Sequence, residues 1–247
     1  MKPTELEKYC EFFSSKESPF LEKIRVKTAE FYSAKYPNDP NRPPSPGGYP
    51  GGKMISGPQV VGFIQFLMRI QGASKILDIG TYTGYSAIAM AEVLAELESK
   101  SGIKGSIVTL EKSREALDLA TSFFNKTSLG GYIQPLLGEA KKLLSLPELD
   151  QQYFDLVFID ADKGSSLEYV DWALKHLTPR GVIIVDDVLW YGQVSEGANG
   201  SATLDKRAGA MHRLNEHLSK NPLIYHQLLP IRHGLQVITL RFLEVAR

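Results

Sequence analysis

The stretch KILDIGTYTGYSAIAMA, residues 75–91, joins an apolar run to a helical pattern through a turn that contains two glycines. Asp78, Gly80 and Gly84 lie where the predicted strand turns into the predicted helix. Glycine at such a turn lets the backbone approach a ligand closely, and the first helical turn offers unpaired N–H groups. We therefore predict a ligand site at this turn, with an ordinary strand-to-helix connection as the alternative.

The order of these residues is D-x-G-x-x-x-G, whereas a dinucleotide site would show G-x-G-x-x-G around its pyrophosphate. The difference favours a ligand without phosphates, with Asp78 available to a cationic amine. One predicted strand further along, Glu111 stands at the carboxyl end of SIVTLE, where an acid can accept both ribose hydroxyls of a nucleoside. A solvated charge at the strand end is the alternative for Glu111. Together the two features favour a nucleoside site.

From residue 75 onward, short apolar runs alternate with longer amphipathic stretches, which is typical of a parallel sheet covered by helices on both faces. The runs are residues 76–79, 106–110, 132–137, 155–160 and 182–187. One helix shows the i, i+4, i+7, i+8 spacing of side chains that pack on a sheet, at Ala116, Leu117, Ala120, Phe123 and Phe124. Two final strand-like runs, residues 224–230 and 235–242, predict a hairpin that makes one sheet edge antiparallel.

The chain of 247 residues suits a single α/β domain, residues 1–247, with a helical extension at its N-terminus. We assign residues 1–36 to the extension, with a helix break near residues 14–19, and residues 53–247 to the core of the domain. Between them, residues 37–52 contain six prolines and four glycines, too many for a helix or a strand. This loop is either a linker or a lid that borders a substrate site.

Composition limits the partners and the compartment. The 28 basic and 28 acidic residues cancel, which argues against nucleic acid or an anionic membrane as the partner, although a local basic patch stays open. Cys10 is the only cysteine, which excludes an internal disulfide and a thiolate zinc site and fits a reducing compartment. The N-terminus lacks the apolar core of a signal peptide, and no stretch approaches the ~20 apolar residues of a membrane helix. We expect a soluble, cytoplasmic protein.

The stretch LVFIDADKG, residues 156–164, ends an apolar strand in charged residues, which is costly in a sheet interior unless a partner waits there. Carboxyl ends of parallel strands gather at one sheet edge, so Asp160 can converge with Asp186 and Asp187. Three carboxylates would repel one another, and a hard dication such as Mg²⁺, with Ca²⁺ or Mn²⁺ as alternatives, would resolve the repulsion. Adjacent strand residues point to opposite faces, so Asp186 and Asp187 both reach one ion only if the strand breaks there. The competing interpretations are helix capping for Asp162 and solvation at the edge for Asp187.

Lys163 follows Asp160 by three positions. Beside a dication its ammonium would be disfavoured, so its pKa would fall from ~10.4 towards the range in which a neutral amine takes up a proton. We predict that Lys163 is a general base, with a surface lysine at the start of a helix as the alternative.

In this order and spacing, DIGTYTGYS, GEA at residues 138–140, FIDADK and DDVLWYG resemble the cation-dependent O-methyltransferases of the caffeoyl-CoA type, with catechol O-methyltransferase as a more distant relative. The similarity extends over nearly the whole chain, and DADK followed by D-D/N-x-L-W is its most specific part. It implies a class I methyltransferase fold, a Rossmann-like doubly wound sheet of seven mostly parallel strands, and a homodimer. The implied reaction transfers the methyl group of S-adenosylmethionine to a hydroxyl of a catechol-like small molecule, a hydroxylated aromatic substrate.

The resemblance also implies roles for individual residues. The residues implied to contact S-adenosylmethionine are Met54, Ser56, Asp78, Gly80, Thr81, Tyr82, Ser86, Glu111, Ala140, Asp160 and Asp162. The implied metal ligands are Asp160, Asp186 and Asp187, and the implied catalytic residues are Lys163 and Asp160. Trp190 and Tyr191 would border the acceptor pocket.

The sequence departs from the family pattern at three places. Asp187 stands where the family usually has Asn, and the added negative charge predicts tighter cation binding. Ser165 and Ser166 replace the usual Asn-Tyr, and Tyr191 follows the tryptophan, which changes the expected acceptor contacts. The proline-rich loop is longer than is typical. These departures weaken the case for a plant-type phenylpropanoid thioester as the substrate.

A phenol has a pKa of about 10, so coordination to a cation would ease its ionisation and fix its oxygen against the methyl group. Vicinal hydroxyls would chelate the ion, which predicts a preference for catechols. Three alternatives stay open: methylation of a hydroxylated nucleobase in tRNA, a cofactor-binding protein without activity, and a nicotinamide-dependent oxidoreductase. The missing G-x-G-x-x-G opposes the last of these.

Overall fold

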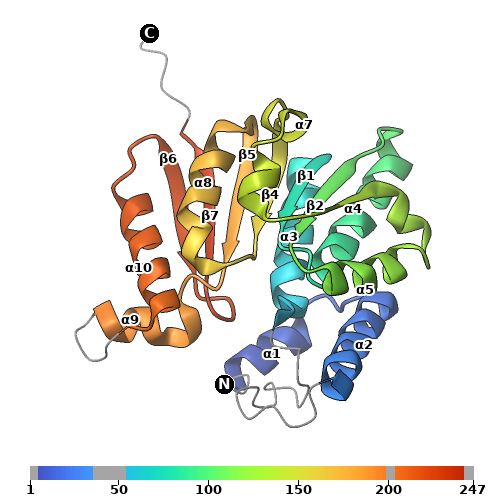
Figure 1. Ribbon diagram of the computed structural model, residues 1–247, viewed down its shortest axis with the longest axis horizontal. Helices are drawn as coiled ribbons and strands as arrows, with labels where there is room; N and C mark the ends of the chain where they lie inside the picture. Colours follow the sequence, from blue (N-terminus) through green and yellow to red (C-terminus); the bar gives the residue numbers. More distant parts are fainter. Residues whose placement is uncertain (1–4, 36–53, 199–203, 242–247) are drawn as a thin grey trace. The chain divides into compact units, whose positions relative to one another are not determined.

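Two compact units carry the fold in the computed structural model. The structure describes residues 5–35, 54–198 and 204–241. The first unit comprises Met1–Ser74 and Gly80–Ala140, and the second comprises Lys75–Ile79 and Lys141–Arg247. The seven strands have the order β3-β2-β1-β4-β5-β7-β6 (Figure 1). The proline-rich loop at residues 37–52 lies outside the described residues, so its assignment as linker or lid stays a prediction.

The first unit consists of helices and two parallel strands. Its strands are β2 (Ser106–Glu111) and β3 (Ile133–Leu137). Its helices are α1 (Glu5–Phe13), α2 (Pro19–Lys35), α3 (Gly57–Gln71), α4 (Tyr85–Ser101), α5 (Arg114–Phe124) and the short 3₁₀ helix η2 (Ser128–Tyr132). The end of α1 at Phe13 and the start of α2 at Pro19 confirm the predicted break in the N-terminal helical region.

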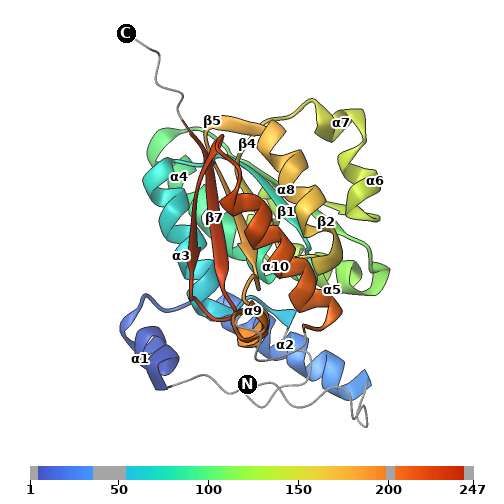
Figure 2. The same ribbon diagram turned by 90° about the vertical axis from the view of Figure 1, so that its left-hand side faces the viewer.

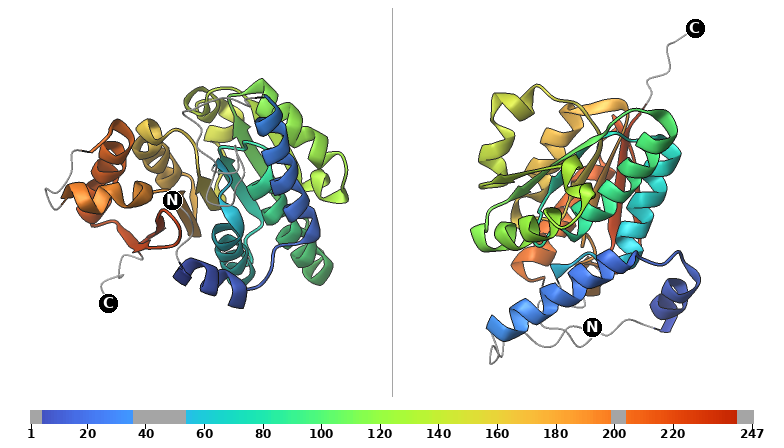
Figure 3. Two further views of the ribbon diagram at one scale, coloured as in Figure 1. Left: turned by 90° about the horizontal axis from the view of Figure 1, so that it is seen from below. Right: turned by 90° about the vertical axis from the view of Figure 1, so that its right-hand side faces the viewer.

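Helix α2 is part of the core of this unit, although the sequence suggested an extension. Leu21 and Ile24 of α2 are buried with Ile88 of α4 and with Phe123 and Phe124 of α5. Figure 3 shows α2, in blue, beside the green helix α5. The buried side of α5 is the predicted set of Ala116, Leu117, Ala120, Phe123 and Phe124. The helical spacing of apolar residues therefore identified this face correctly.

The second unit holds the other five strands. They are β1 (Lys75–Ile79), β4 (Phe154–Ile159), β5 (Leu177–Asp186), β6 (Ile224–Leu229) and β7 (Leu235–Leu240). Its helices are α6 (Ala140–Leu144), α7 (Pro147–Asp150), α8 (Ser166–Lys175), α9 (Gln193–Ala198), α10 (Lys206–Ser219) and the 3₁₀ helices η3 (Lys163–Ser165) and η4 (Trp190–Gly192). Helix α8 packs on β4 and β5, and α10 packs on β6 and beside α8 (Figure 2).

The pairing of these strands explains their composition. Strands β1, β4 and β5 are parallel, and the apolar residues of β4 are fully buried, as expected where both faces of a sheet are covered. Strand β7 runs antiparallel to β5 and to β6. The predicted fold class, an α/β doubly wound, mostly parallel sheet with an antiparallel hairpin at its edge, is confirmed.

None of the helices that the structure describes is long and apolar enough to cross a bilayer.

Gly84, before α4, is required by packing as well as by backbone geometry. Its φ is 83°, and a Cβ added there would lie 2.5 Å from Cε1 of the buried Phe124. We expect Gly84→Ala to lower the free energy of unfolding by about 2–5 kcal/mol, because a left-handed alanine costs ~1–2 and overpacking ~1–3 kcal/mol. Gly102→Ala is the matched control, since φ is 72° there and nothing lies within 4 Å of the added Cβ. Urea unfolding of both variants measures the difference, and equal losses would show that Phe124 moves aside freely.

Candidate active site

The acidic residues of the site follow the carboxyl ends of two adjacent parallel strands. Asp160 comes directly after β4, and Asp186 is the last residue of β5. Asp187 leaves the strand with a φ of 63°, and its backbone N–H donates to Asp186 Oδ1 at 2.7 Å. The strand break that the sequence required for both carboxylates to serve one site is therefore confirmed.

Lys163 joins these residues. Its Nζ lies 2.9 Å from Asp160 Oδ1 and 3.2 Å from Asp187 Oδ2, and it donates to the backbone oxygen of Asp186 at 3.3 Å. Lys163 is only 8% exposed and starts the 3₁₀ helix η3, whose turn carries the side chain back to the strand ends. The structure thus brings together Asp160, Lys163, Asp186 and Asp187, as predicted, and excludes the alternative of Lys163 as a surface lysine.

The carboxylates and the ammonium shift one another's pKa. Burial alone would lower the pKa of Lys163, but Asp160, Asp187 and Asp186 outweigh it and raise this pKa above its ordinary value. Burial, then Asp187 and Asp160, raise the pKa of Asp186 well above the usual carboxyl range, while Lys163 and Arg232 oppose the shift. The predicted fall in the pKa of Lys163 was made for a site that holds a dication, and it stays a prediction.

The donor atoms of the cluster suit a hard cation in their chemistry. The three carboxylates and the one ammonium leave an excess of negative charge at a buried place. Oxygen atoms are the ligands that Mg²⁺ and Ca²⁺ prefer. Within residues 5–35, 54–198 and 204–241, however, no group of three His, Cys, Asp or Glu side chains is arranged to hold a metal ion. The ammonium of Lys163 stands between Asp160 and Asp187 in this structure.

Asp162 caps the start of η3. Its Oδ1 accepts from the backbone N–H of Ser165 at 3.1 Å, and its Oδ2 accepts from the hydroxyl of Tyr169 at 2.7 Å. The capping interpretation is therefore confirmed, and the predicted contact with the cofactor stays a prediction. Sequence reasoning missed Tyr169, although seven residues span two helical turns and place it on the same side as Asp162. Burial and this hydrogen bond raise the pKa of Tyr169.

In the first unit, the carboxylate of Glu111 holds the glycine turn. Its Oε2 accepts from the backbone N–H of Tyr82, and its Oε1 accepts from that of Ser113, both at 2.8 Å. A carboxylate oxygen has room for a second donor, so both oxygens retain acceptor capacity for ribose hydroxyls. Tyr82 has a φ of 48° and stacks on Tyr32 of α2, with ring centroids 5.3 Å apart.

Polar groups of the glycine turn form hydrogen bonds with the end of β2. The backbone N–H groups of Gly80 and Thr81 both donate to the oxygen of Leu110 at 3.0 Å, and the hydroxyls of Thr81 and Thr109 lie 2.6 Å apart. These groups therefore hold the turn on β2. Their predicted contacts with a cofactor stay predictions.

The other predicted cofactor residues lie at the ends of elements. Asp78 in β1 is fully buried, and Ser86 in the first turn of α4 is 5% exposed. Ser56 immediately before α3 is 6% exposed, whereas the nearby Met54 is 58% exposed. Ala140 is the first residue of α6.

Trp190 and Tyr191 form the turn after the strand break. The indole Nε1 of Trp190 donates to Asp205 Oδ2 at 3.1 Å, and the ring centroid of Tyr191 lies 3.9 Å from that of His233. Burial and the neighbouring Asp187 raise the pKa of Tyr191. Their predicted place beside the acceptor stays a prediction.

Backbone strain is concentrated near these residues. The non-glycine residues with positive φ in the described part of the chain are Tyr82, Asp187, Trp190, Tyr191 and Arg232. Four of them were predicted site residues, and Arg232 was not. Such conformations cost about 1–3 kcal/mol each and are found preferentially at functional sites.

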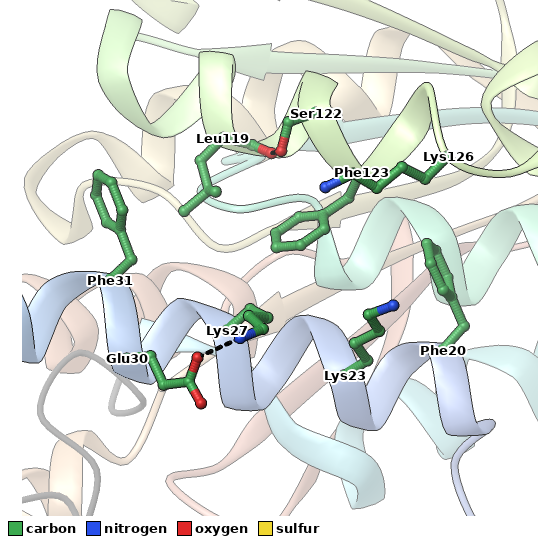
Figure 4. Close-up of a pocket in the computed structure, with 9 residues that line it drawn as sticks. All are labelled: Phe20, Lys23, Lys27, Glu30, Phe31, Leu119, Ser122, Phe123 and Lys126. Carbon is green, nitrogen blue, oxygen red and sulfur yellow. Dashed lines mark hydrogen bonds and ion pairs between the residues drawn. The ribbon is translucent and has the colours of Figure 1, made fainter.

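A groove of about 400 Å³ lies elsewhere, between α2 and α5 of the first unit (Figure 4). It is lined by Phe20, Lys23, Lys27, Glu30, Phe31, Leu119, Ser122, Phe123 and Lys126. None of these residues belongs to the predicted site. Lys27 is paired with Glu30 at 2.6 Å.

Comparison with known proteins identifies the family. Residues 48–241 match the O-methyltransferase family, and the chain belongs to it. A catechol O-methyltransferase domain-containing protein 1 of Mus musculus is 33% identical over 175 residues, which are 69% of this chain and 62% of that protein. A probable caffeoyl-CoA O-methyltransferase 2 of Dictyostelium discoideum is 29% identical over 188 residues, 75% of this chain and 77% of the other. An O-methyltransferase of Bacillus cereus, solved in complex with SAH, has a TM-score of 0.75 at 28% identity and covers 97% of this chain and 98% of its own.

Removal of the Lys163 charge should make stability depend on pH. Without added cations, we expect Lys163→Met to lose about 3–5 kcal/mol of unfolding free energy at pH 8, because three carboxylates then face one another in a buried place. A carboxyl whose folded pKa lies above its unfolded value stabilises the fold as pH falls, and the substitution raises the pKa of Asp186 further. The loss should therefore shrink between pH 8 and pH 5. Urea unfolding across this range measures it, with the exposed Lys175→Met as control; a loss that does not change with pH would contradict the account.

Proposed function

We propose that this O-methyltransferase moves the methyl group of S-adenosylmethionine to a hydroxyl group of a catechol-like small molecule and depends on a divalent cation. The observation that carries the proposal is the cluster of Asp160, Lys163, Asp186 and Asp187 at the ends of β4 and β5. Buried charge of this kind is costly for a protein unless it has a use.

The names of the relatives support the donor and the class of acceptor. The Bacillus cereus structure was solved with SAH, the product that the donor leaves after methyl transfer. The names of three relatives contain caffeoyl-CoA, catechol and flavonoid, which are aromatic compounds that carry hydroxyl groups. Neither nucleobase methylation nor a role without catalysis is favoured by a specific feature of the described residues.

For the donor, we assign the binding roles that the sequence implied. Glu111 has acceptor capacity left for the ribose hydroxyls, and the buried Asp78 would bind the cationic amine of the methionine part. Asp162, held by Ser165 and Tyr169, would lie beside the adenine part.

For the acceptor, the cluster supplies charge and position. Asp160, Asp186 and Asp187 would hold the cation, which supplies Lewis acidity and so eases the loss of a proton from a bound hydroxyl group. Lys163 is fixed by Asp160 and Asp187 and would hold the proton at Nζ. Burial of Lys163 excludes bulk water from the place where charge develops.

We also propose that the protein is a homodimer that associates through α1 and α3. Leu6, Tyr9, Phe12 and Phe13 of α1 are between 63% and 72% exposed, although all are large and apolar or aromatic. Gln59 of α3 donates to the backbone oxygen of Glu7, so α1 is held against α3. Exposed Phe66 and Ile70 of α3 add to this surface, and an apolar patch of this kind marks an interaction site.

Methyl transfer to catechol from labelled S-adenosylmethionine tests the proposed reaction. Excess EDTA should lower the rate at least about tenfold, and Mg²⁺ should restore it, because the cation stabilises the ionised hydroxyl. Lys163→Met should lose roughly 10²-fold or more in kcat, whereas Lys175→Met, the same change at an exposed site on α8, should keep wild-type activity. Undiminished activity in EDTA would reject the metal role.

The carboxylate of Asp187 should contribute directly to cation affinity. By isothermal titration with Mg²⁺ in the absence of substrate, we expect Asp187→Asn to bind about tenfold more weakly, because one ligand charge is lost. Asp118→Asn, an exposed change on α5, is the control and should bind as the wild type does. Tighter binding by Asp187→Asn would contradict the prediction.

A further inference from the structure

The turn between β6 and β7 lies directly beyond the acidic cluster. Strand β7 is antiparallel to β5, and its first residue, Leu235, pairs with Asp186. Residues 230–234, which precede Leu235, therefore continue past the carboxyl end of β5. This placement follows from strand register alone.

The turn is fixed to the segment that follows the strand break. The backbone N–H of Leu189 donates to the oxygen of His233 at 2.7 Å, and that of Val188 donates to Gly234 at 3.1 Å. A Cβ on Gly234 would lie 2.5 Å from Leu189 Cγ, so only glycine allows so close an approach. The ring of His233 rests on Tyr191 at 3.9 Å between centroids. These contacts fix the turn next to Tyr191, which is predicted to border the acceptor.

Arg232 has a strained backbone conformation in this turn. Its φ is 52°, a left-handed conformation that glycine adopts without cost and that is uncommon for a long side chain. Arg232 is half-buried.

The charge of Arg232 is felt inside the site. It lowers the pKa of Asp186 and that of Tyr191, against the larger effects of burial and of the neighbouring carboxylates. The guanidinium of Arg232 adds a positive charge close to the place proposed for the acceptor. A positive charge there favours an anionic acceptor over a neutral one.

We propose that Arg232 is a specificity residue that binds an anionic group, such as a carboxylate, on the aromatic acceptor, with His233 as a positioning residue that fixes Tyr191 beside it. The inference rests on the proposed function, because it concerns the acceptor of that same reaction. A guanidinium matches a carboxylate with two parallel N–H donors, which gives orientation as well as affinity. The acceptor would thus be oriented by its hydroxyls at the acidic cluster and by its anionic group at the turn.

A matched pair of acceptors tests the inference: 3,4-dihydroxybenzoate, which carries a carboxylate, and 4-methylcatechol, which carries a methyl group at the same position. Steady-state kinetics would be measured with the wild type, Arg232→Gly and Arg232→Lys. Glycine suits the positive φ, so Arg232→Gly removes the charge without straining the backbone of the turn, and the Tm of each variant is measured to check that it is folded. Arg180→Gly, an exposed arginine at the start of β5, is the control for loss of a charge.

We expect Arg232→Gly to raise KM for 3,4-dihydroxybenzoate about tenfold, since a charge-assisted hydrogen bond is lost, and to leave kcat/KM for 4-methylcatechol within about twofold. Arg232→Lys, which keeps the charge but not the two parallel donors, should retain only part of the preference, and Arg180→Gly should retain all of it. An equal loss of kcat/KM for both acceptors would show that Arg232 acts only on the acidic cluster. No loss of kcat/KM for either acceptor would show that Arg232 does not touch the acceptor. Each of these results overturns the inference and leaves the proposed function intact. A wild type that methylates neither catechol overturns the proposed function and the inference with it.

Discussion

The buried ammonium of Lys163 lies 2.9 Å from Asp160 and 3.2 Å from Asp187, where the ends of β4 and β5 would otherwise set three carboxylates against one another. Asp186, the third of them, is almost fully buried at the last position of β5. A buried charge without a partner destabilises a protein by several kcal/mol, so the geometry of both strand ends depends on this contact. The excess of negative charge that remains is what a divalent cation would neutralise, and it links the stability of the apoprotein to the chemistry proposed for the enzyme.

The acidic cluster is bordered by residues with a strained backbone, both directly after β5 and in the turn before β7. Asp187 departs from β5 in a left-handed conformation, which turns two successive carboxylates towards one place although a regular strand would point them apart. Trp190, Tyr191 and Arg232 also have positive φ and lie in two turns. Backbone hydrogen bonds and the contact of His233 with Tyr191 join these two turns. Turns fixed in this way hold their side chains at constant positions, which a pocket that discriminates between acceptors requires.

The sequence predicted the fold well, because apolar runs and helical spacing are local signals that burial in the sheet enforces. The buried face of α5 and the antiparallel hairpin were predicted correctly. The convergence of Asp160 with Asp186 and Asp187 was also predictable, since carboxyl ends of parallel strands share one edge. The sequence did not reveal Tyr169 as the partner of Asp162, because that contact depends on hydrogen bonding. It did not reveal that the turn with Arg232 lies beyond the end of β5 either, because that placement depends on strand register. The burial of α2 among α4 and α5 was likewise missed, since mixed charge on that helix concealed its apolar side.

A crystal structure with Mn²⁺ and S-adenosylhomocysteine tests the central claim most directly, because anomalous scattering locates the ion independently of the refined coordinates. The account predicts an anomalous peak within about 2.0–2.6 Å of carboxylate oxygens of Asp160, Asp186 and Asp187, with the Lys163 ammonium no longer between Asp160 and Asp187. A map without such a peak, in which Lys163 still bridges these two carboxylates, would contradict it.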